Sequence, residues 1–378
     1  MGPNLPRYGC RRPGRVNAWF RSECFGFGPA GTGAHPDYNG PPRSRRERVE
    51  HTRSPETPFV PSPIEAVASS DVRWTESTLA ALIETTKPGI TRLVTITSGV
   101  GFALAAVSHN WAAWDLLLTA LGCLIGTACS AAGANALNQW MERDRDARMT
   151  RTGSRPLPRG QLAPGGVFAW GASLAMVGLV VLLVSGGPVP AIISAVTIFS
   201  YLLIYTPSKP RTSVSTIIGA VPGALPPLIG WAAASKVVGI GALADPAGWS
   251  LFLIMFVWQI PHFLSIAWMY RDDYAAGGHC VLPVVDLTGR STFAAMLVWT
   301  ICLIPVSLAP AVFLSDWLGG VYAAVALLLG LIFLGFVVRF IIVRTREAAR
   351  ATFIWSVIHL PILLLVMVAE AMGRKFFA

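Results

Sequence analysis

The sequence predicts an all-α, polytopic membrane protein with about nine transmembrane helices, and three observations lead to this prediction. Of its 378 residues, 53% are hydrophobic and only 13% are charged. The apolar residues form long uninterrupted stretches, and the loops between these stretches alternate between strongly basic and almost uncharged. Because about 20 apolar residues suffice for a helix to cross a bilayer, each long stretch is predicted to be a membrane span.

The predicted spans follow one another with short connections, and several contain Gly or Pro, as in GAVPGALPPLIGW. Such breaks are tolerated in a membrane where helices pack on one another or line a polar cavity. The spans cover residues 88–107, 115–137, 165–186, 190–206, 213–233, 248–270, 292–314, 319–343 and 351–372.

The charge of the loops predicts the orientation of the chain. Basic residues follow the second, fourth, sixth and eighth spans, whereas the intervening loops carry almost nothing but Lys236. The positive-inside rule then places the basic loops in the cytoplasm, or in the matrix of a mitochondrion. The formal net charge of +10 is therefore expected to favour contact with an anionic membrane surface and binding of an anionic substrate. We expect no nucleic-acid partner.

Residues 1–75 differ in composition from the rest, with many Arg, Pro, Gly and Ser and few aliphatic residues. We expect a disordered basic N-terminal tail there, followed by a transmembrane domain over residues 76–378. The tail has no short apolar core of a secretory signal. A mitochondrial presequence, a bacterial extension and a start codon placed too far upstream remain open. The expected location is the bacterial inner membrane or, alternatively, the mitochondrial inner membrane.

The most informative motif is a polar stripe that runs out of the second apolar stretch. Asn138, Glu142 and Asp146 are four residues apart, so on an α-helix they drift by only about 40° per step and share one face. Asp144 is out of phase with them. Acidic groups at a membrane boundary that is also rich in Arg suit a divalent cation and a polyanionic ligand better than a lipid-facing surface.

Two further polar segments fall on the same side of the membrane. In WQIPHFLSIAWMYRDDYAAGG, His262 and Asp273 are eleven residues apart, so on one helix they would share a face with Gln259. In YTPSKPRTS, Lys209 and Arg211 occupy a short loop. Taken singly, a core histidine and ordinary positive-inside topology explain these residues. Together with the stripe they indicate an apolar substrate with a diphosphate head that enters from the lipid.

These motifs resemble a known family. N-x-x-x-E-x-D-x-D at 138–146 and R-T-x-x-R-P-L-P at 151–158 are similar to the first signature of the intramembrane UbiA-type prenyltransferases. The Glu142 variant, YTPSKPRTS, GALPPLIGW and PHFLSIAWMYRDDY resemble the branch of protoheme IX farnesyltransferases, or heme O synthases. The resemblance covers residues 80–372.

The resemblance implies nine helices around a central cavity that opens to lipid. It also implies Mg²⁺-dependent binding of farnesyl diphosphate and transfer of the farnesyl group to a vinyl group of heme B (protoheme IX), with addition of water, as a step in heme A biosynthesis. Heme B is then a substrate, and heme A synthase or oxidase assembly factors are candidate protein partners. The implied catalytic residues are Asn138, Glu142, Asp146 and His262. The implied diphosphate-binding residues are Arg151, Arg155, Lys209 and Arg211, and the implied metal ligands are Glu142, Asp146 and Asp273.

Two alternative functions remain open from the sequence. Another membrane aromatic prenyltransferase would make a quinone or chlorophyll precursor, which requires the Glu-containing signature and the PHFLSIAW segment both to mislead. A transporter also uses broken helices and intramembrane polar groups, but its charged sites are expected near the bilayer midplane, with repeated halves. Here the clusters lie at one membrane face and no repeat is evident.

Overall fold

A computed structural model of the chain describes residues 76–235 and 238–377, and the tail predicted over residues 1–75 lies outside them. In this part of the chain all regular structure is helical. Nine of its segments are long and apolar enough to cross a membrane, which confirms the predicted count. The protein is thus a multi-pass membrane protein.

Seven spans are single helices, and two are composite. The single ones are α2 (Pro88–Val107), α3 (Ala113–Asp146), α4 (Pro164–Gly186), α9 (Pro246–Met269), α12 (Arg290–Phe313), α13 (Gly320–Val343) and α14 (Arg346–Phe377). The fourth span joins α5 (Pro188–Phe199), the π-helical η2 (Ser200–Tyr205) and α6 (Thr206–Ser208). The fifth joins α7 (Ser215–Ala224) and α8 (Pro226–Ala234).

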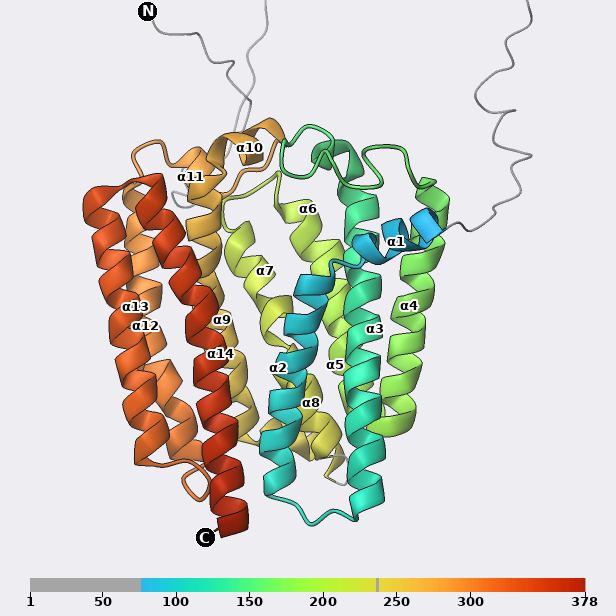
Figure 1. The fold of residues 1–378 in the computed structure, drawn as a ribbon, viewed down its shortest axis with the longest axis vertical. Coiled ribbons are helices and arrows are strands. Elements are labelled where there is room, and N and C mark those ends of the chain that lie inside the picture. Colours follow the sequence, from blue (N-terminus) through green and yellow to red (C-terminus); the bar gives the residue numbers. More distant parts are fainter. Residues whose placement is uncertain (1–75, 236–237, 378) are drawn as a thin grey trace, which may run out of the picture. The chain divides into compact units, whose positions relative to one another are not determined.

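Short helices occupy the connections. They are α1 (Glu76–Thr85), the 3₁₀ segment η3 (Gly239–Ala244), α10 (Arg271–Ala276) and α11 (Leu282–Val285). In Figure 1, α1, α10 and α11 lie at one end of the helix bundle, together with the basic loop that follows α3. The C-terminal end of α14 lies at the opposite end. This arrangement is the one expected of an odd number of spans whose basic loops share one membrane face.

Glycines allow close packing of the first helices. A Cβ added to Gly133 or Gly178 would collide with the backbone of the facing helix in the α3–α4 pair. In the same way Gly101 of α2 meets Pro227 of α8, and Gly230 of α8 meets Ser98 of α2. Lipid tails are as apolar as the helix surfaces, so membrane helices associate through this kind of close backbone approach.

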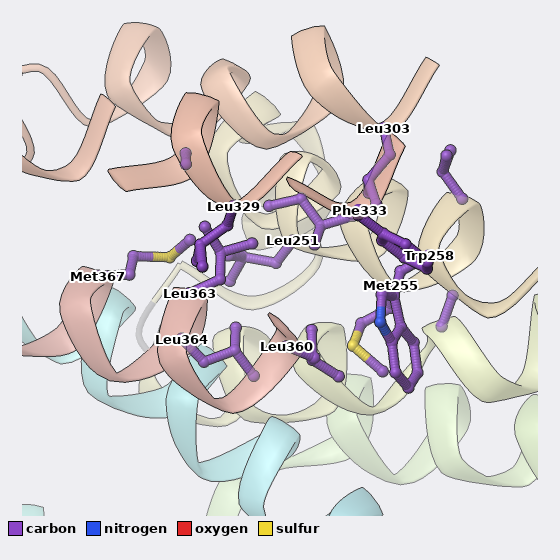
Figure 2. Packing of buried hydrophobic residues seen from close by; sticks show 14 of the residues in the cluster. Leu251, Met255, Trp258, Leu303, Leu329, Phe333, Leu360, Leu363, Leu364 and Met367 are labelled. Carbon is purple, nitrogen blue, oxygen red and sulfur yellow. The ribbon is translucent and has the colours of Figure 1, made fainter. Parts of the chain in front are cut away.

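The second half of the chain packs around larger side chains. Figure 2 shows Leu251 and Trp258 of α9 among Leu303 of α12, Phe333 of α13 and Leu360 of α14. Of these, Leu303 and Phe333 are fully buried. This cluster fixes α9 and α14 against each other, and both helices contribute to the wall of the cavity described below.

The chain bends at Tyr270, where α9 ends and α10 begins with backbone angles outside the helical region (φ −115°, ψ 30°). The expectation that His262 and Asp273 share a face of one continuous helix is therefore wrong. His262 lies inside the bundle on α9, whereas Asp273 lies on α10 at the basic end. Residue spacing does not predict a shared face across a bend, because the second helix has its own axis.

Candidate functional site

A cavity of about 470 Å³ lies between α2, α3, η2, α7, α9 and α14. Its volume falls in the range of about 300–1,000 Å³ that is usual for small-molecule sites. Polar side chains gather at the basic end of the bundle, namely Lys87, Glu142, Asp146, Arg151, Thr152, Arg155, Lys209, Tyr274 and His279. The body is mainly apolar and includes Leu93, Val94, Met255, Trp258 and Phe263. Ile90 and Phe263, both in the wall, are also exposed, so the cavity reaches the lipid-facing surface.

The polar stripe lies on one buried face of α3. Asn138, Glu142 and Asp146 are 0%, 5% and 4% exposed, and the two carboxylates line the cavity. By contrast the side chain of Asp144 is 84% exposed. The 34 residues of α3 span about 50 Å, more than the roughly 30 Å of bilayer hydrocarbon. The helix can therefore carry its acidic end at the membrane boundary.

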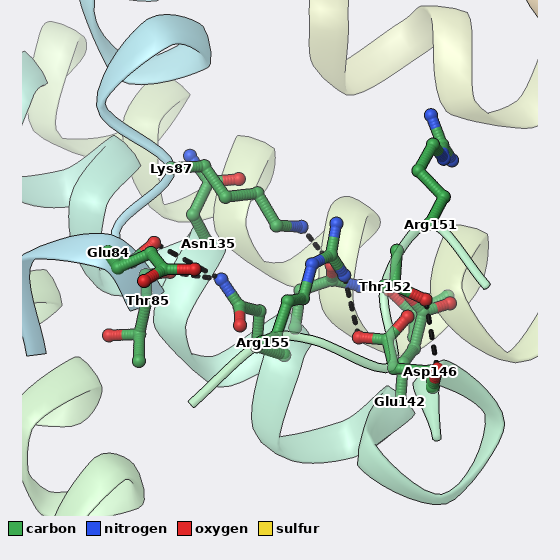
Figure 3. A network of polar contacts seen from close by, with 12 residues as sticks. Glu84, Thr85, Lys87, Asn135, Glu142, Asp146, Arg151, Thr152 and Arg155 are labelled. Atoms are coloured by element: carbon green, nitrogen blue, oxygen red, sulfur yellow. Dashed lines mark hydrogen bonds and ion pairs between the residues drawn. The ribbon is translucent and has the colours of Figure 1, made fainter. Parts of the chain in front are cut away.

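Each carboxylate of the stripe has a basic partner from another segment. Lys209, just after α6, lies 2.9 Å from both oxygens of Glu142. Arg155, in the loop after α3, lies 2.6 Å from Asp146 Oδ2, as Figure 3 shows. Buried carboxylates without such partners would be costly. The α3 stripe therefore depends on cations that are 9 and 67 residues away in sequence.

Lys87 was not among the residues predicted for the site, but the structure places it there. It precedes α2, lines the cavity and donates a hydrogen bond of 2.6 Å to Asn138 Oδ1. Asn138 in turn donates to Glu142 Oε2 at 3.0 Å. Burial, and then repulsion from Arg155 and Lys209, lowers the pKa of Lys87 to about 7. A bound anion would stabilise the protonated form of Lys87.

The loop after α3 is fastened to α10. The Asp273 carboxylate accepts hydrogen bonds from the backbone N–H groups of Thr150, at 2.6 Å, and Arg151, at 3.2 Å. The Arg151 guanidinium stacks over Tyr270 and Tyr274 and lines the cavity. Asp273 is not brought together with Glu142 and Asp146, and it does not line the cavity. Its contacts hold the segment that carries Arg151 and Arg155.

Arg211 lies apart from the other predicted diphosphate ligands. It is exposed and lines a separate small pocket with Arg145 and Pro207. Lys209, two residues earlier, points into the main cavity instead. Both residues lie in the loop that follows α6, and these close sequence neighbours face different sides.

His262 lines the body of the cavity on α9. Its Nδ1 lies 2.7 Å from the Ser356 hydroxyl of α14. Its ring stacks on Trp258 with centroids 4.7 Å apart. His279 is a second histidine in the wall, at the polar end, and it was not among the residues predicted for the site. Burial, and then repulsion from Lys209, lowers its pKa to about 4.

The oxygen donors of the stripe fit a divalent cation. Glu142 and Asp146 supply hard carboxylate oxygens, and both side chains line the cavity. Within residues 76–235 and 238–377, no three His, Cys, Asp or Glu side chains converge as a metal-ligand group. Mg²⁺ commonly takes one or two carboxylates from a protein and completes its coordination with water and substrate phosphate.

Comparison with solved structures shows the same fold. The chain is similar to a structure of digeranylgeranylglyceryl phosphate synthase, with a TM-score of 0.63 and 17% identity over 78% of this chain and 99% of the other. A UbiA homolog from Aeropyrum pernix gives a TM-score of 0.59 with 14% identity, over 74% and 97% of the two chains.

Comparison of sequences gives closer relatives. The protoheme IX farnesyltransferase of Solibacter usitatus is 46% identical over 296 residues, which cover 77% of this chain and 98% of the relative. That of Opitutus terrae is 41% identical, over 76% and 93%. The UbiA prenyltransferase family model matches residues 93–358, which contain nearly all of the cavity wall. The chain is therefore a prenyltransferase enzyme and belongs to the UbiA prenyltransferase family.

Proposed function

We propose that this enzyme transfers the farnesyl group of farnesyl diphosphate to a vinyl group of heme B, with addition of water, and releases heme O and diphosphate. The observation that carries the proposal is the head of the cavity. There Lys87, Arg155 and Lys209 surround the carboxylates of Glu142 and Asp146, directly above an apolar body. The names of the relatives supply the acceptor, since both are protoheme IX farnesyltransferases.

The diphosphate would bind at this polar head. Four basic side chains of the described cavity wall, Lys87, Arg151, Arg155 and Lys209, outnumber the two carboxylates there. The excess positive charge favours a polyanion and stabilises it further as the allylic C–O bond breaks. In this proposal Arg155 and Lys209 exchange their carboxylate partners for phosphate oxygens. Arg211, which lies outside the cavity, is not proposed to bind the diphosphate.

Glu142 and Asp146 are the proposed ligands of Mg²⁺, with the Asn138 amide holding Glu142 in place. When bound, the cation would neutralise diphosphate charge and so favour its departure. We assign Asp273 to the fastening of the Arg151 loop and not to the metal, because both of its oxygens already accept backbone hydrogen bonds.

The apolar body would hold the prenyl chain and exclude water from the reacting carbon. Leu93 and Val94 of α2 line it together with Met255 and Trp258 of α9. Such a wall would keep water away from an allylic cation until the vinyl group of the acceptor attacks it. The opening beside Ile90 and Phe263 gives two hydrophobic substrates a route from the bilayer.

A step in heme A formation and a place in the bacterial inner membrane, or alternatively the mitochondrial inner membrane, complete the proposal. The two relatives named above come from bacteria. Heme A synthase or oxidase assembly factors would then be the proteins that receive the product.

The direct test is to express the chain in a bacterium that lacks heme O synthase and to analyse extracted hemes by mass spectrometry. We expect heme O from the wild-type chain and none from Glu142→Gln at the same membrane level. A prenylated quinone precursor without heme O, from a well-expressed protein, would show that the acceptor is wrong.

A further inference from the structure

We propose that Ser356 of α14 is a positioning residue that fixes the tautomer of His262, so that an unprotonated Nε2 faces the cavity as a proton acceptor. The chemical use of this nitrogen rests on the proposed function. The tautomer itself is a property of the protein alone and can be measured without substrate.

The Ser356 hydroxyl has two close partners. Ser356 Oγ lies 2.6 Å from the carbonyl oxygen of Phe353, one turn earlier on α14. It also lies 2.7 Å from His262 Nδ1 on α9. Ser356 is 0% exposed, so solvent does not compete for either contact.

The number of hydrogens decides the direction of these bonds. A carbonyl oxygen can only accept, and a serine hydroxyl has one hydrogen to donate. If Ser356 donates to Phe353, both contacts are hydrogen bonds only when His262 Nδ1 carries a hydrogen and donates to Ser356 Oγ. In a neutral imidazole the other nitrogen, Nε2, then has a free lone pair.

Aromatic neighbours hold the ring in this orientation. Trp258, one turn before His262, stacks on the imidazole with centroids 4.7 Å apart and an interplanar angle of 24°. The Trp258 indole N–H donates to the backbone carbonyl of Ser356 at 2.9 Å. The ring of Phe353 lies 5.1 Å away. A 180° flip of the ring about Cβ–Cγ would put Cδ2 in the place of Nδ1 and lose the Ser356 contact.

In the proposed reaction the free nitrogen would accept the proton that is released when water adds. The Nδ1 side of the ring meets α14, while His262, Trp258 and Phe353 all line the cavity. C1 of the farnesyl chain leaves the diphosphate oxygen and bonds to the terminal vinyl carbon. A water oxygen then bonds to the inner vinyl carbon, next to the porphyrin. Nε2 takes one proton of this water and passes it on to diphosphate or solvent.

The first experiment measures the tautomer in the full-length protein in lipid. Nitrogen-15 NMR of labelled histidines at about pH 8, where an ordinary imidazole is neutral, distinguishes the two tautomers. The His262 signal is identified by its loss in His262→Asn. We expect Nδ1–H with bare Nε2 in the wild type and in Ser356→Thr, and a shift toward Nε2–H in Ser356→Ala. A wild-type signal of the Nε2–H form would overturn the proposal.

The second experiment measures turnover. We expect Ser356→Ala to lower kcat by about 10-fold with KM for farnesyl diphosphate within about twofold, and Ser356→Thr to restore most of the activity. Ser265→Ala is the matched control, since Ser265 is a fully buried α9 serine whose hydroxyl donates to the Pro261 carbonyl. An equal loss in Ser265→Ala, or no loss in Ser356→Ala, would contradict the positioning role.

His262→Asn separates the proton acceptor from the contact between helices. Its amide N–H can still donate to Ser356, but no atom replaces Nε2, so we expect kcat to fall by about 100-fold. Wild-type kcat in this variant would overturn the proton-acceptor role. If only the proposed function were wrong, the NMR signals would still show the expected tautomers, but the protein would make no heme O.

Discussion

At the scale of single residues, Glu142 and Asp146 combine burial with full ionic pairing, which marks them as the centre of the site. We expect Glu142→Gln and Asp146→Asn each to lower prenyl transfer by at least about 100-fold, because they remove the charge proposed to hold Mg²⁺ and diphosphate. Heme O formation by purified protein is the measurement. Asp144→Asn is the control and should stay within about twofold, since Asp144 is exposed.

An active Asp146→Asn enzyme would remove the metal assignment. If both variants were missing from the membrane, the cause would be misfolding, because the buried cations Arg155 and Lys209 would have lost their ionic partners. Quantifying membrane-inserted protein beside activity separates the two cases.

Lys87 provides a second prediction at this scale. Lys87→Met keeps the length of the side chain but removes its charge, and a charged hydrogen bond contributes about 1.5–3 kcal/mol. We expect KM for farnesyl diphosphate to rise by about 10-fold to 100-fold. Arg211→Met should leave KM nearly unchanged, because Arg211 lies outside the cavity. Equal effects of the two variants in steady-state kinetics would mean that general surface charge, and not the cavity head, attracts the substrate.

The sequence could predict the α3 stripe but not its contact with Lys87. Asn138, Glu142 and Asp146 repeat with the helical period, which is a local property. Lys87 meets Asn138 across 51 positions, and no local pattern encodes that contact. Its position before the first span, at the basic end, was the available signal.

At the scale of elements, the spans were predictable from hydropathy because length and composition alone define them. Their interruptions were not. The π segment Ser200–Tyr205 and the bend at Tyr270 depend on packing against neighbours, and they decide which residues face the cavity. The bend explains why Asp273 does not lie beside His262 as expected, and the course of the loop after α6 places Arg211 outside the cavity that Lys209 lines.

Close packing of α2 on α8 gives a prediction for an element. We expect Gly230→Ala to destabilise the protein by about 1–3 kcal/mol, since the new methyl group would collide with the Ser98 carbonyl and an overpacked contact must shift the backbone. Gly335→Ala on α13 is the control, because a Cβ there meets nothing within 4 Å. Thermal unfolding in detergent should show a lower Tm for Gly230→Ala alone. Equal Tm values would mean that α2 and α8 separate easily.

At the scale of the whole molecule, charge is sorted between the two ends of the bundle. The basic loops and the site share one end, while Arg374 and Lys375 lie at the other. These two residues have local partners. Lys375 donates to the Val107 carbonyl at the end of α2, at 2.9 Å. Arg374 pairs with Glu370, which also accepts from the backbone N–H of Tyr322 near the start of α13. Lys375 and the Arg374–Glu370 pair thus satisfy backbone groups at the ends of neighbouring helices. Their positive charge need not indicate the cytoplasmic side of the membrane.

Deletion of residues 1–70 tests the proposed domain boundary. Every described residue of the cavity wall lies at or after Lys87, and the match to the Solibacter usitatus relative covers 98% of that relative but 77% of this chain. We expect the truncated protein to insert normally and to form heme O at a rate within about twofold of the full chain after bacterial expression, because the low apolar content of residues 1–75 gives them little with which to build a site. Membrane fractionation and heme analysis at matched protein levels are the measurements. If the segment is a mitochondrial presequence, the truncated protein would be mislocalised in its host yet active in the bacterium. A truncated protein that inserts but makes no heme O would place part of the working enzyme before residue 71, and the boundary at residue 76 would have to move.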